Sequence, residues 1–286
     1  MNLNFWVIQA FNGISYGALL FLVGSGLSLI FGVMRIVNLS HGSYFLLGGY
    51  VALTVIWTTG SWVLAIPVSA LVIGLVGLAM ERVFLRPLGF DPLRQVLLTV
   101  GFAFLFQQAA LDIWTGNNFD ITPPAALSQS VQLGGIYFPL YRLFMIAIAL
   151  AIGLGLWLVM EKTRIGAQVR ATVDDAQMAR GIGIDTSRIS MMIFSLGAAL
   201  AALGGVIGGA FLGIYIGLDF EMLPIAFAVV IIGGMGSLGG AAIGALLVGL
   251  ADNFGKALFP EISYFTLYAP MALILAIKPT GLFGRE

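Results

Sequence analysis

The sequence has little charge for its length. Among 286 residues there are 13 Lys and Arg and 13 Asp and Glu, so only 9 % of the chain is charged, against about 25 % in a typical soluble domain. Hydrophobic residues make up 60 %, and the mean hydropathy is +1.04. Because so few charges cannot solvate the surface of a chain this long, a soluble globular protein and a disordered chain are excluded. The composition indicates an all-α integral membrane protein.

Cysteine is absent, and histidine occurs once, at His41. The lack of cysteine excludes disulfides, thiolate metal sites and a cysteine nucleophile. A zero net charge without a basic block argues against nucleic acid binding, and no Gly-x-x-x-x-Gly-Lys-Ser/Thr run offers a P-loop. We therefore expect no catalytic residue, no metal site and no cofactor bound by this chain.

Apolar stretches of membrane-helix length recur along the whole chain. Including the shorter ones, we predict eight to nine transmembrane helices, some short or broken, in one transmembrane domain that covers residues 1–286. The predicted spans are about Phe5–Gly32, Ser43–Trp57, Trp62–Glu81, Val96–Trp114, Leu140–Met160, Ile189–Leu212, Leu223–Ile232, Ala241–Asn253 and Tyr264–Ile277.

The basic residues predict an orientation. Eleven of the thirteen fall on one side of these spans, which by the positive-inside rule places the N-terminus outside and the C-terminus in the cytoplasm. Asp219 then falls in a loop on the outer side. The eleven are Arg35, Arg82, Arg86, Arg94, Lys162, Arg164, Arg170, Arg180, Arg188, Lys278 and Arg285.

The long outer (periplasmic) loop, at about 115–139, has alternating apolar residues at Val131, Leu133 and Ile136. This pattern predicts a small hairpin or a segment that lies on the membrane. The loop is a candidate docking surface, and an ordinary connector is the alternative.

Two apolar stretches are interrupted by glycine and small polar residues, Leu27–Leu53 and Val229–Leu250. Matching interruptions in two halves indicate an internally repeated transporter with broken helices, because broken backbone inside a membrane persists only where protein or water satisfies it. The alternative is a pair of plain turns. In that case Asn38 and Ser40 serve as N-caps of a helix that begins at His41 or Gly42.

The most polar stretch is the predicted cytoplasmic loop at about 161–188. We predict a helix that is capped by Thr172 or Asp174, runs through Arg180 and is ended by Gly181 in the left-handed conformation. Apolar side chains on such a helix can enter a groove of a partner protein. The alternative is a solvated loop whose apolar side chains lie on the lipid.

Three segments resemble the LivH-type permeases of the branched-chain amino acid ABC transporter family. They are Phe31–Gly42 (FGVMRIVNLSHG), Arg170–Asp185 (RATVDDAQMARGIGID) and Gly233–Gly240 (GGMGSLGG). The resemblance covers essentially the whole chain, in order. It implies an importer permease of the bacterial inner membrane that has no ATPase site of its own, while partner chains bind ATP and Mg.

The resemblance also implies partners and sites. The partners are a LivM-type second permease, two ATPases of the LivF and LivG types, and a periplasmic substrate-binding protein. The implied ATPase-coupling residues are Arg170, Asp174, Asp175, Met178, Ala179, Gly181 and Ile182. The candidate residues of the translocation path are Asn38, Ser40, His41, Gly42, Gln107, Gln108, Gly236, Ser237 and Gly239. For the two glutamines, a hydrogen bond between helices is the alternative.

Alternatives remain for the substrate and for the class. Families of this resemblance also import urea, short amides and aromatic carboxylates. The alternative from another class is a stand-alone ion-coupled transporter. Against it, the spans contain one histidine and no clear buried acidic relay to carry the coupling ion. A membrane-embedded enzyme lacks support, because the chain has no cysteine, no metal-ligand cluster and no paired catalytic carboxylates.

Overall fold

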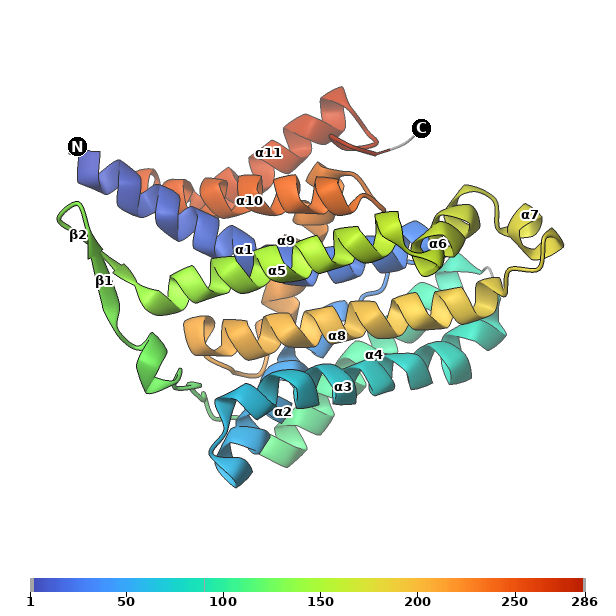
Figure 1. Cartoon of the computed structure of the whole chain (residues 1–286), viewed down its shortest axis with the longest axis horizontal. Helices are drawn as coiled ribbons and strands as arrows, with labels where there is room; N and C mark the ends of the chain where they lie inside the picture. Colours follow the sequence, from blue (N-terminus) through green and yellow to red (C-terminus); the bar gives the residue numbers. More distant parts are fainter. Residues whose placement is uncertain (1–2, 90, 285–286) are drawn as a thin grey trace.

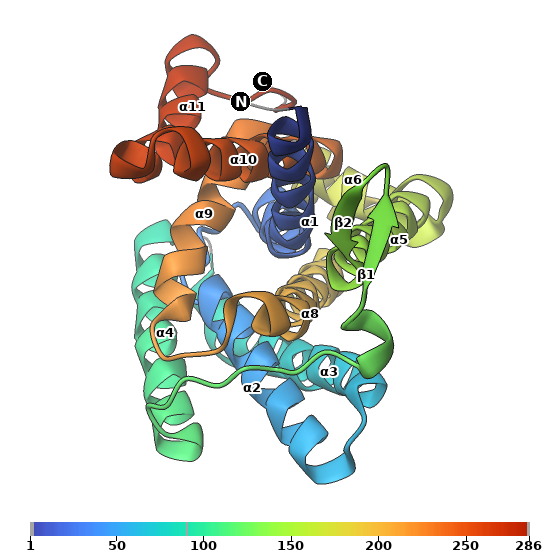
Figure 2. The same cartoon turned by 90° about the vertical axis from the view of Figure 1, so that its left-hand side faces the viewer.

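The computed structural model describes residues 3–89 and 91–284, and most of these residues lie in helices (Figures 1 and 2). The α-helices are α1 (Leu3–Met34), α2 (His41–Thr59), α3 (Trp62–Met80), α4 (Pro92–Trp114), α5 (Leu140–Lys162), α6 (Arg164–Asp174), α7 (Ala176–Gly181), α8 (Thr186–Leu212), α9 (Leu218–Gly233), α10 (Leu238–Leu258) and α11 (Ser263–Ile277). The strands are β1 (Ser130–Leu133) and β2 (Ile136–Pro139).

The helices form a bundle with a buried centre and an exposed apolar rim. In α1 and α8, 72% and 67% of the most apolar stretch is buried, against 17% in α4 and 22% in α5. Helix α1 packs against α5, α8, α9 and α10, whereas α8 packs against α1, α2 and α3. The rim helices present apolar side chains outward, as a lipid environment requires.

Within the described residues, six helices are long and apolar enough to cross a bilayer: α1, α3 with its continuation to Leu88, α4, α5, α8 and α10. This confirms the all-α, multi-pass membrane class. Helices α2, α9 and α11 are shorter or less apolar, so the count of eight to nine crossings is not confirmed. The internal repeat stays a prediction.

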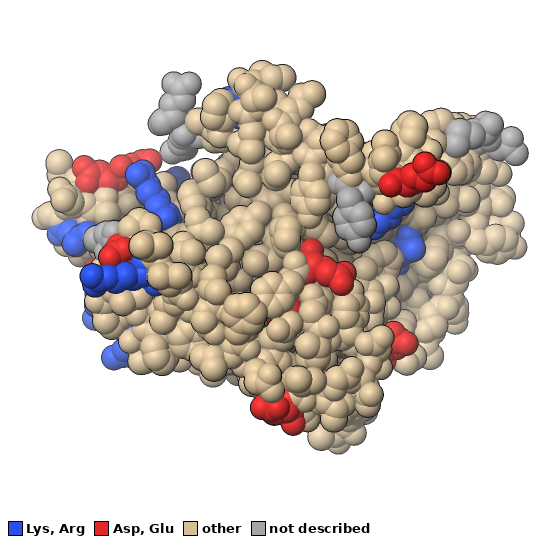
Figure 3. All heavy atoms as spheres, turned by 180° about the vertical axis from the view of Figure 1, so that it is seen from behind, with Lys and Arg blue, Asp and Glu red and all other residues tan. Residues whose placement is uncertain are grey.

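The two ends of the bundle differ in charge. One end carries the N-terminal part of α1 and the β1–β2 hairpin, and we call it the hairpin end (Figure 1). The other carries α6 and α7, and we call it the α6–α7 end. Basic side chains gather at the α6–α7 end, and the face between the ends carries few charges (Figure 3). Arg285 lies outside the described residues.

The outer loop contains the predicted hairpin. Strands β1 and β2 pair antiparallel, with Leu133 opposite Ile136. The loop also covers the hairpin end of α2, because the Phe119 ring packs against the Trp57 ring with centroids 5.3 Å apart. Just before the loop, the indole N–H of Trp114, the last residue of α4, donates to the Thr54 hydroxyl over 2.7 Å. Phe119 forms a β-bridge with Ile214, just before α9.

Polar residues at helix starts explain several boundaries. The side chains of Ser61, Asp91, Thr163, Asp175, Asp185 and Ser237 each accept a hydrogen bond from a first-turn N–H group of the helix that follows. Such caps satisfy donors that a helix start leaves free.

The helix predicted across 172–181 is wrong in two details. The chain breaks at Asp175, whose carboxylate accepts from the N–H groups of Gln177 and Met178, so neither Thr172 nor Asp174 is the cap. The left-handed residue after α7 is Gly183, with φ +90°, rather than Gly181.

Candidate functional site

The first predicted break takes the chain back inside the bundle. His41 opens α2, and its Nε2 lies 3.0 Å from the carbonyl oxygen of Val23. Since Val23 precedes the end of α1 at Met34 by eleven residues, the chain has returned by about 16 Å along α1. Three residues of the returning segment are buried: Ile36, Asn38 and Ser40. Helix α2 therefore begins inside the protein, and the plain-turn alternative is wrong here.

Helix α9 begins at the same place. The backbones touch, because a Cβ added to Gly42 would lie 2.3 Å from the carbonyl oxygen of Asp219. The Ser43 hydroxyl donates to Oδ2 of Asp219 over 3.1 Å. Figure 2 shows α9 between α10 and α4. Two helix N-termini, each the positive end of a helix dipole, thus meet inside the bundle.

Asp219 is the charged group at this meeting point. It is 2 % exposed and accepts from Ser43 and, over 3.5 Å, from Nε2 of Gln107. Gln108 points elsewhere, because it is exposed and donates to Asp112 one turn along α4. The structure therefore brings Gln107 to the α2–α9 junction, while Gln108 lies on the outer surface of α4.

A second group of polar side chains holds the start of α2. The Ser40 hydroxyl donates to Oδ1 of Asn38 over 2.7 Å, and the Tyr44 hydroxyl donates to the sulfur of Met80 over 2.8 Å. Ser40 stands at the N-cap position but makes no side-chain cap bond. Ser40 is therefore the N-cap residue by position, as expected, but the expected side-chain cap bonds to the helix are absent, and Oδ1 of Asn38 instead accepts from the backbone N–H of Ser40 over 3.1 Å. Nδ2 of Asn38 and Nδ1 of His41 are buried without a partner.

The second break lies nearer the α6–α7 end. Ser237 caps α10 by accepting from the N–H of Gly240, and its carbonyl accepts from Ser28 over 3.3 Å. Gly236 packs against Gly32, close to the end of α1. Gly239 lines an apolar groove of about 610 Å³ between α1, α5 and α10.

Sequence reasoning missed Asp219 and Ser43, and it found no buried acidic group. Among the residues that the structure describes, three acidic side chains are buried: Asp219, Glu81 and Asp252, at 2 %, 2 % and 5 % exposure. The expected outer-loop position of Asp219 is wrong, since it lies in the first turn of α9. An acid directly before the apolar run 222–233 is the signal that could have placed it at a helix start.

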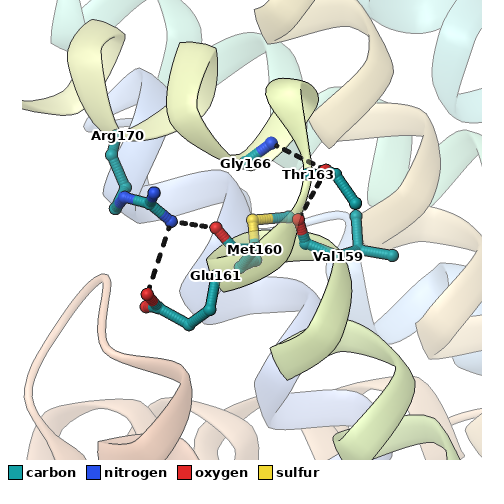
Figure 4. A network of polar contacts seen from close by, with 6 residues as sticks. All are labelled: Val159, Met160, Glu161, Thr163, Gly166 and Arg170. Atoms are coloured by element: carbon teal, nitrogen blue, oxygen red, sulfur yellow. Dashed lines mark hydrogen bonds and ion pairs between the residues drawn. The ribbon is translucent and has the colours of Figure 1, made fainter.

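At the α6–α7 end, α6 folds back tightly on the end of α5 (Figure 4). The Thr163 hydroxyl donates to the Val159 carbonyl over 2.6 Å and accepts from the N–H of Gly166 over 3.2 Å. The Arg170 guanidinium donates to the carbonyl of Met160 and lies 3.7 Å from the carboxylate of Glu161. These contacts fix α6 to the bundle.

The residues expected to contact an ATPase divide by exposure. Met178 and Ile182 are 65 % and 70 % exposed, and Asp174, Asp175 and Gly181 are exposed as well. Ala179 is 2 % exposed, so in this structure it packs inward instead of offering a contact surface. Two large apolar side chains thus stand exposed, Met178 on the short, capped helix α7 and Ile182 directly after it.

The fold and the α2–α9 junction define a polytopic membrane protein with helices interrupted inside the bundle, as membrane transporters have. A family model described as branched-chain amino acid transport system / permease component matches residues 9–275. The chain belongs to this family of transport permeases.

Relatives agree over nearly the full length. The high-affinity branched-chain amino acid transport system permease protein LivH of Escherichia coli K12 is 30% identical over 300 residues, covering 98% of this chain and 96% of the relative. BraD of Pseudomonas aeruginosa, described in the same words, is 28% identical over 97% of this chain and 95% of its own. The autoinducer 2 import permease LsrC of Salmonella paratyphi B is 30% identical over 55% of this chain and 46% of its own. No solved structure gives a significant match.

Proposed function

We propose that this chain is the transmembrane permease subunit of an ABC importer that moves branched-chain amino acids across the bacterial inner membrane. The family membership and the near-full-length likeness to LivH and BraD support the substrate class. The observation that carries the transport role is the meeting of the α2 and α9 starts at the buried carboxylate of Asp219.

The junction suits a zwitterion. The positive dipole ends of α2 and α9 favour the substrate carboxylate, and the Asp219 carboxylate favours the ammonium group. Ser43 and Gln107 hold Asp219 in place by donating to its carboxylate oxygens. They therefore compete with the substrate ammonium group for these oxygens. A transport path must release the substrate that it binds, so the permease binds the substrate weakly. Tight binding is then the role of the separate substrate-binding protein.

The partners and the orientation follow from the same proposal. The α6–α7 end faces the cytoplasm, because basic residues gather there. Met178 and Ile182 enter a groove on an ATPase, which binds ATP and Mg. A second, LivM-type permease completes the membrane part, and the outer loop 115–139 receives the periplasmic binding protein.

The test is reconstituted transport. The tagged chain is purified gently with the proteins that accompany it, placed in proteoliposomes and supplied with binding protein and labelled leucine. We expect two ATPases and a second permease to co-purify, and uptake to require ATP. Recovery of the chain alone, with leucine uptake in the absence of ATP, would refute the importer and favour an ion-coupled transporter.

A matched pair of variants tests the junction. Asp219→Asn keeps the shape and removes the charge, and Asp112→Asn makes the same change on the exposed face of α4. We expect Asp219→Asn to reduce uptake at least tenfold while the complex still assembles, and Asp112→Asn to leave uptake near wild type. Equal uptake by the two variants would remove Asp219 from the path. Unlabelled urea, short amides and aromatic carboxylates are then tested as competitors of labelled leucine uptake. If one of them inhibits uptake more strongly than unlabelled leucine does, the proposed substrate class is wrong.

A further inference from the structure

A pocket of about 290 Å³ with polar and apolar walls lies at the α6–α7 end. Its walls come from the α1–α2 break, the end of α3, α7 and the start of α8. The volume is close to the lower limit of small-molecule sites, roughly 300 Å³. The residues of the α2–α9 junction are not part of its lining.

The deepest charged group in this pocket is Glu81. It is 2 % exposed, and its Oε2 has no hydrogen-bond partner. None of the ion pairs found among the described residues includes it. Glu81 also begins a π-helical turn, Glu81–Leu85, that continues α3, and such turns are frequent at functional sites. A buried carboxylate oxygen without a hydrogen bond is costly to maintain. Arg86 acts on Glu81 electrostatically but forms none of the ion pairs found among the described residues, so Oε2 can accept a hydrogen bond from a bound donor.

The opposite charge and an apolar wall stand in the same pocket. Arg86 and Arg180 belong to its lining, and the guanidinium group of an arginine can bind a carboxylate in a bidentate manner. Apolar side chains from three elements complete the wall: Met34, Ile36 and Leu85. One site therefore offers an acceptor for an ammonium group, donors for a carboxylate, and a surface for an aliphatic side chain.

We propose that this pocket binds the zwitterion of an aliphatic α-amino acid on the α6–α7 side, with the ammonium group at Glu81 and the carboxylate at Arg86 and Arg180. The proposal rests on the proposed function, which makes such an amino acid the released product. Since Arg180 belongs to α7 and Glu81 to the end of α3, an occupied pocket joins the coupling segment to the bundle. Released product then slows the transport cycle.

Direct binding tests the proposal without relying on transport. The purified complex in nanodiscs, without the binding protein, is titrated calorimetrically with leucine, with leucinol, which lacks the carboxylate, and with 4-methylpentanoate, which lacks the ammonium group. We expect both analogues to bind at least tenfold more weakly than leucine. Glu81→Gln weakens the binding of leucine at least tenfold and leaves the binding of 4-methylpentanoate unchanged.

Further variants separate the pocket from its surroundings. Arg86→Gln weakens the binding of leucine and leaves the binding of leucinol unchanged. Arg82 is an exposed neighbour outside the pocket, and Arg82→Gln changes the binding of neither ligand. Asp219→Asn leaves this binding intact. Since Arg86 is exposed, its variant keeps the test decisive if Glu81→Gln alters folding, which a melting temperature reveals.

The outcomes are separable from those for the proposed function. Absent leucine binding, or binding that Glu81→Gln and Arg86→Gln leave unchanged, would overturn the pocket even if ATP-driven leucine uptake is normal. Charge-dependent binding in a complex that takes up leucine without ATP would support the pocket and refute the importer.

Discussion

The turn between α5 and α6 gives the sharpest mutational prediction. An added Cβ on Gly166 would lie 2.1 Å from the carbonyl oxygen of Met160 and 2.5 Å from that of Val159. The first distance is about 1.3 Å short of an ordinary contact, and the obstacle is backbone, so α6 must move. Gly166→Ala should therefore destabilise the protein by about 1–3 kcal/mol and displace the segment that we propose as the coupling surface.

Two glycines of the same segment serve as controls. Gly183 has open space around it but a φ of +90°, so Gly183→Ala should cost about 1 kcal/mol through backbone strain alone. Gly181 has open space, and its φ is not positive. Because alanine suits a helix better than glycine, Gly181→Ala should be neutral or stabilising by up to about 1 kcal/mol.

The assay measures stability and coupling together. Melting temperatures of the three variants in detergent, ATPase co-purification and ATP-driven uptake should all rank Gly166→Ala as the most damaging and Gly181→Ala as the least. A Gly166→Ala variant with wild-type melting temperature and uptake would refute the steric argument. So would a Gly181→Ala variant as damaged as Gly166→Ala.

Three further predictions concern hydrogen bonds. Asp175→Ala removes the cap of two α7 N–H groups and should cost about 0.5–2 kcal/mol, visible as faster amide exchange across α7. Ser43→Ala removes a donor to the Asp219 carboxylate, which should cost about 1.5–3 kcal/mol and lower uptake; unchanged uptake and melting temperature would contradict this. Trp114→Phe loses the bond to Thr54 and should lower the local stability by about 0.5–1.5 kcal/mol. The readout is faster protease cleavage within 115–139.

The positions of the helices could be predicted because they depend on local composition. Apolar runs of about 20 residues mark membrane helices whatever their neighbours are. The start of α2 was expected at His41 or Gly42, and the helix begins at His41. The hairpin followed from alternation over a few residues. The end of α7 was misplaced, because both Gly181 and Gly183 are compatible with a helix stop and the choice depends on backbone geometry.

The candidate site divides in the same way. Asn38, Ser40, His41 and Gly42 stood out, because polar residues interrupt an apolar run. Asp219 did not, since an acid beside an apolar run normally marks a loop in water. Its burial requires Ser43 and Gln107, which lie 176 and 112 residues away along the chain, and no local pattern records such a meeting.

The sequence by itself determined that this protein lies in a membrane, where most of its helices run and which end gathers positive charge, because hydrophobicity and charge act locally. Only the tertiary structure decided that α2 starts beside Val23, that α9 starts beside Gly42, and that Glu81 and Asp219 are buried. The physical reason is that burial depends on contacts between segments far apart in the chain, which must fold together before a carboxylate is removed from water.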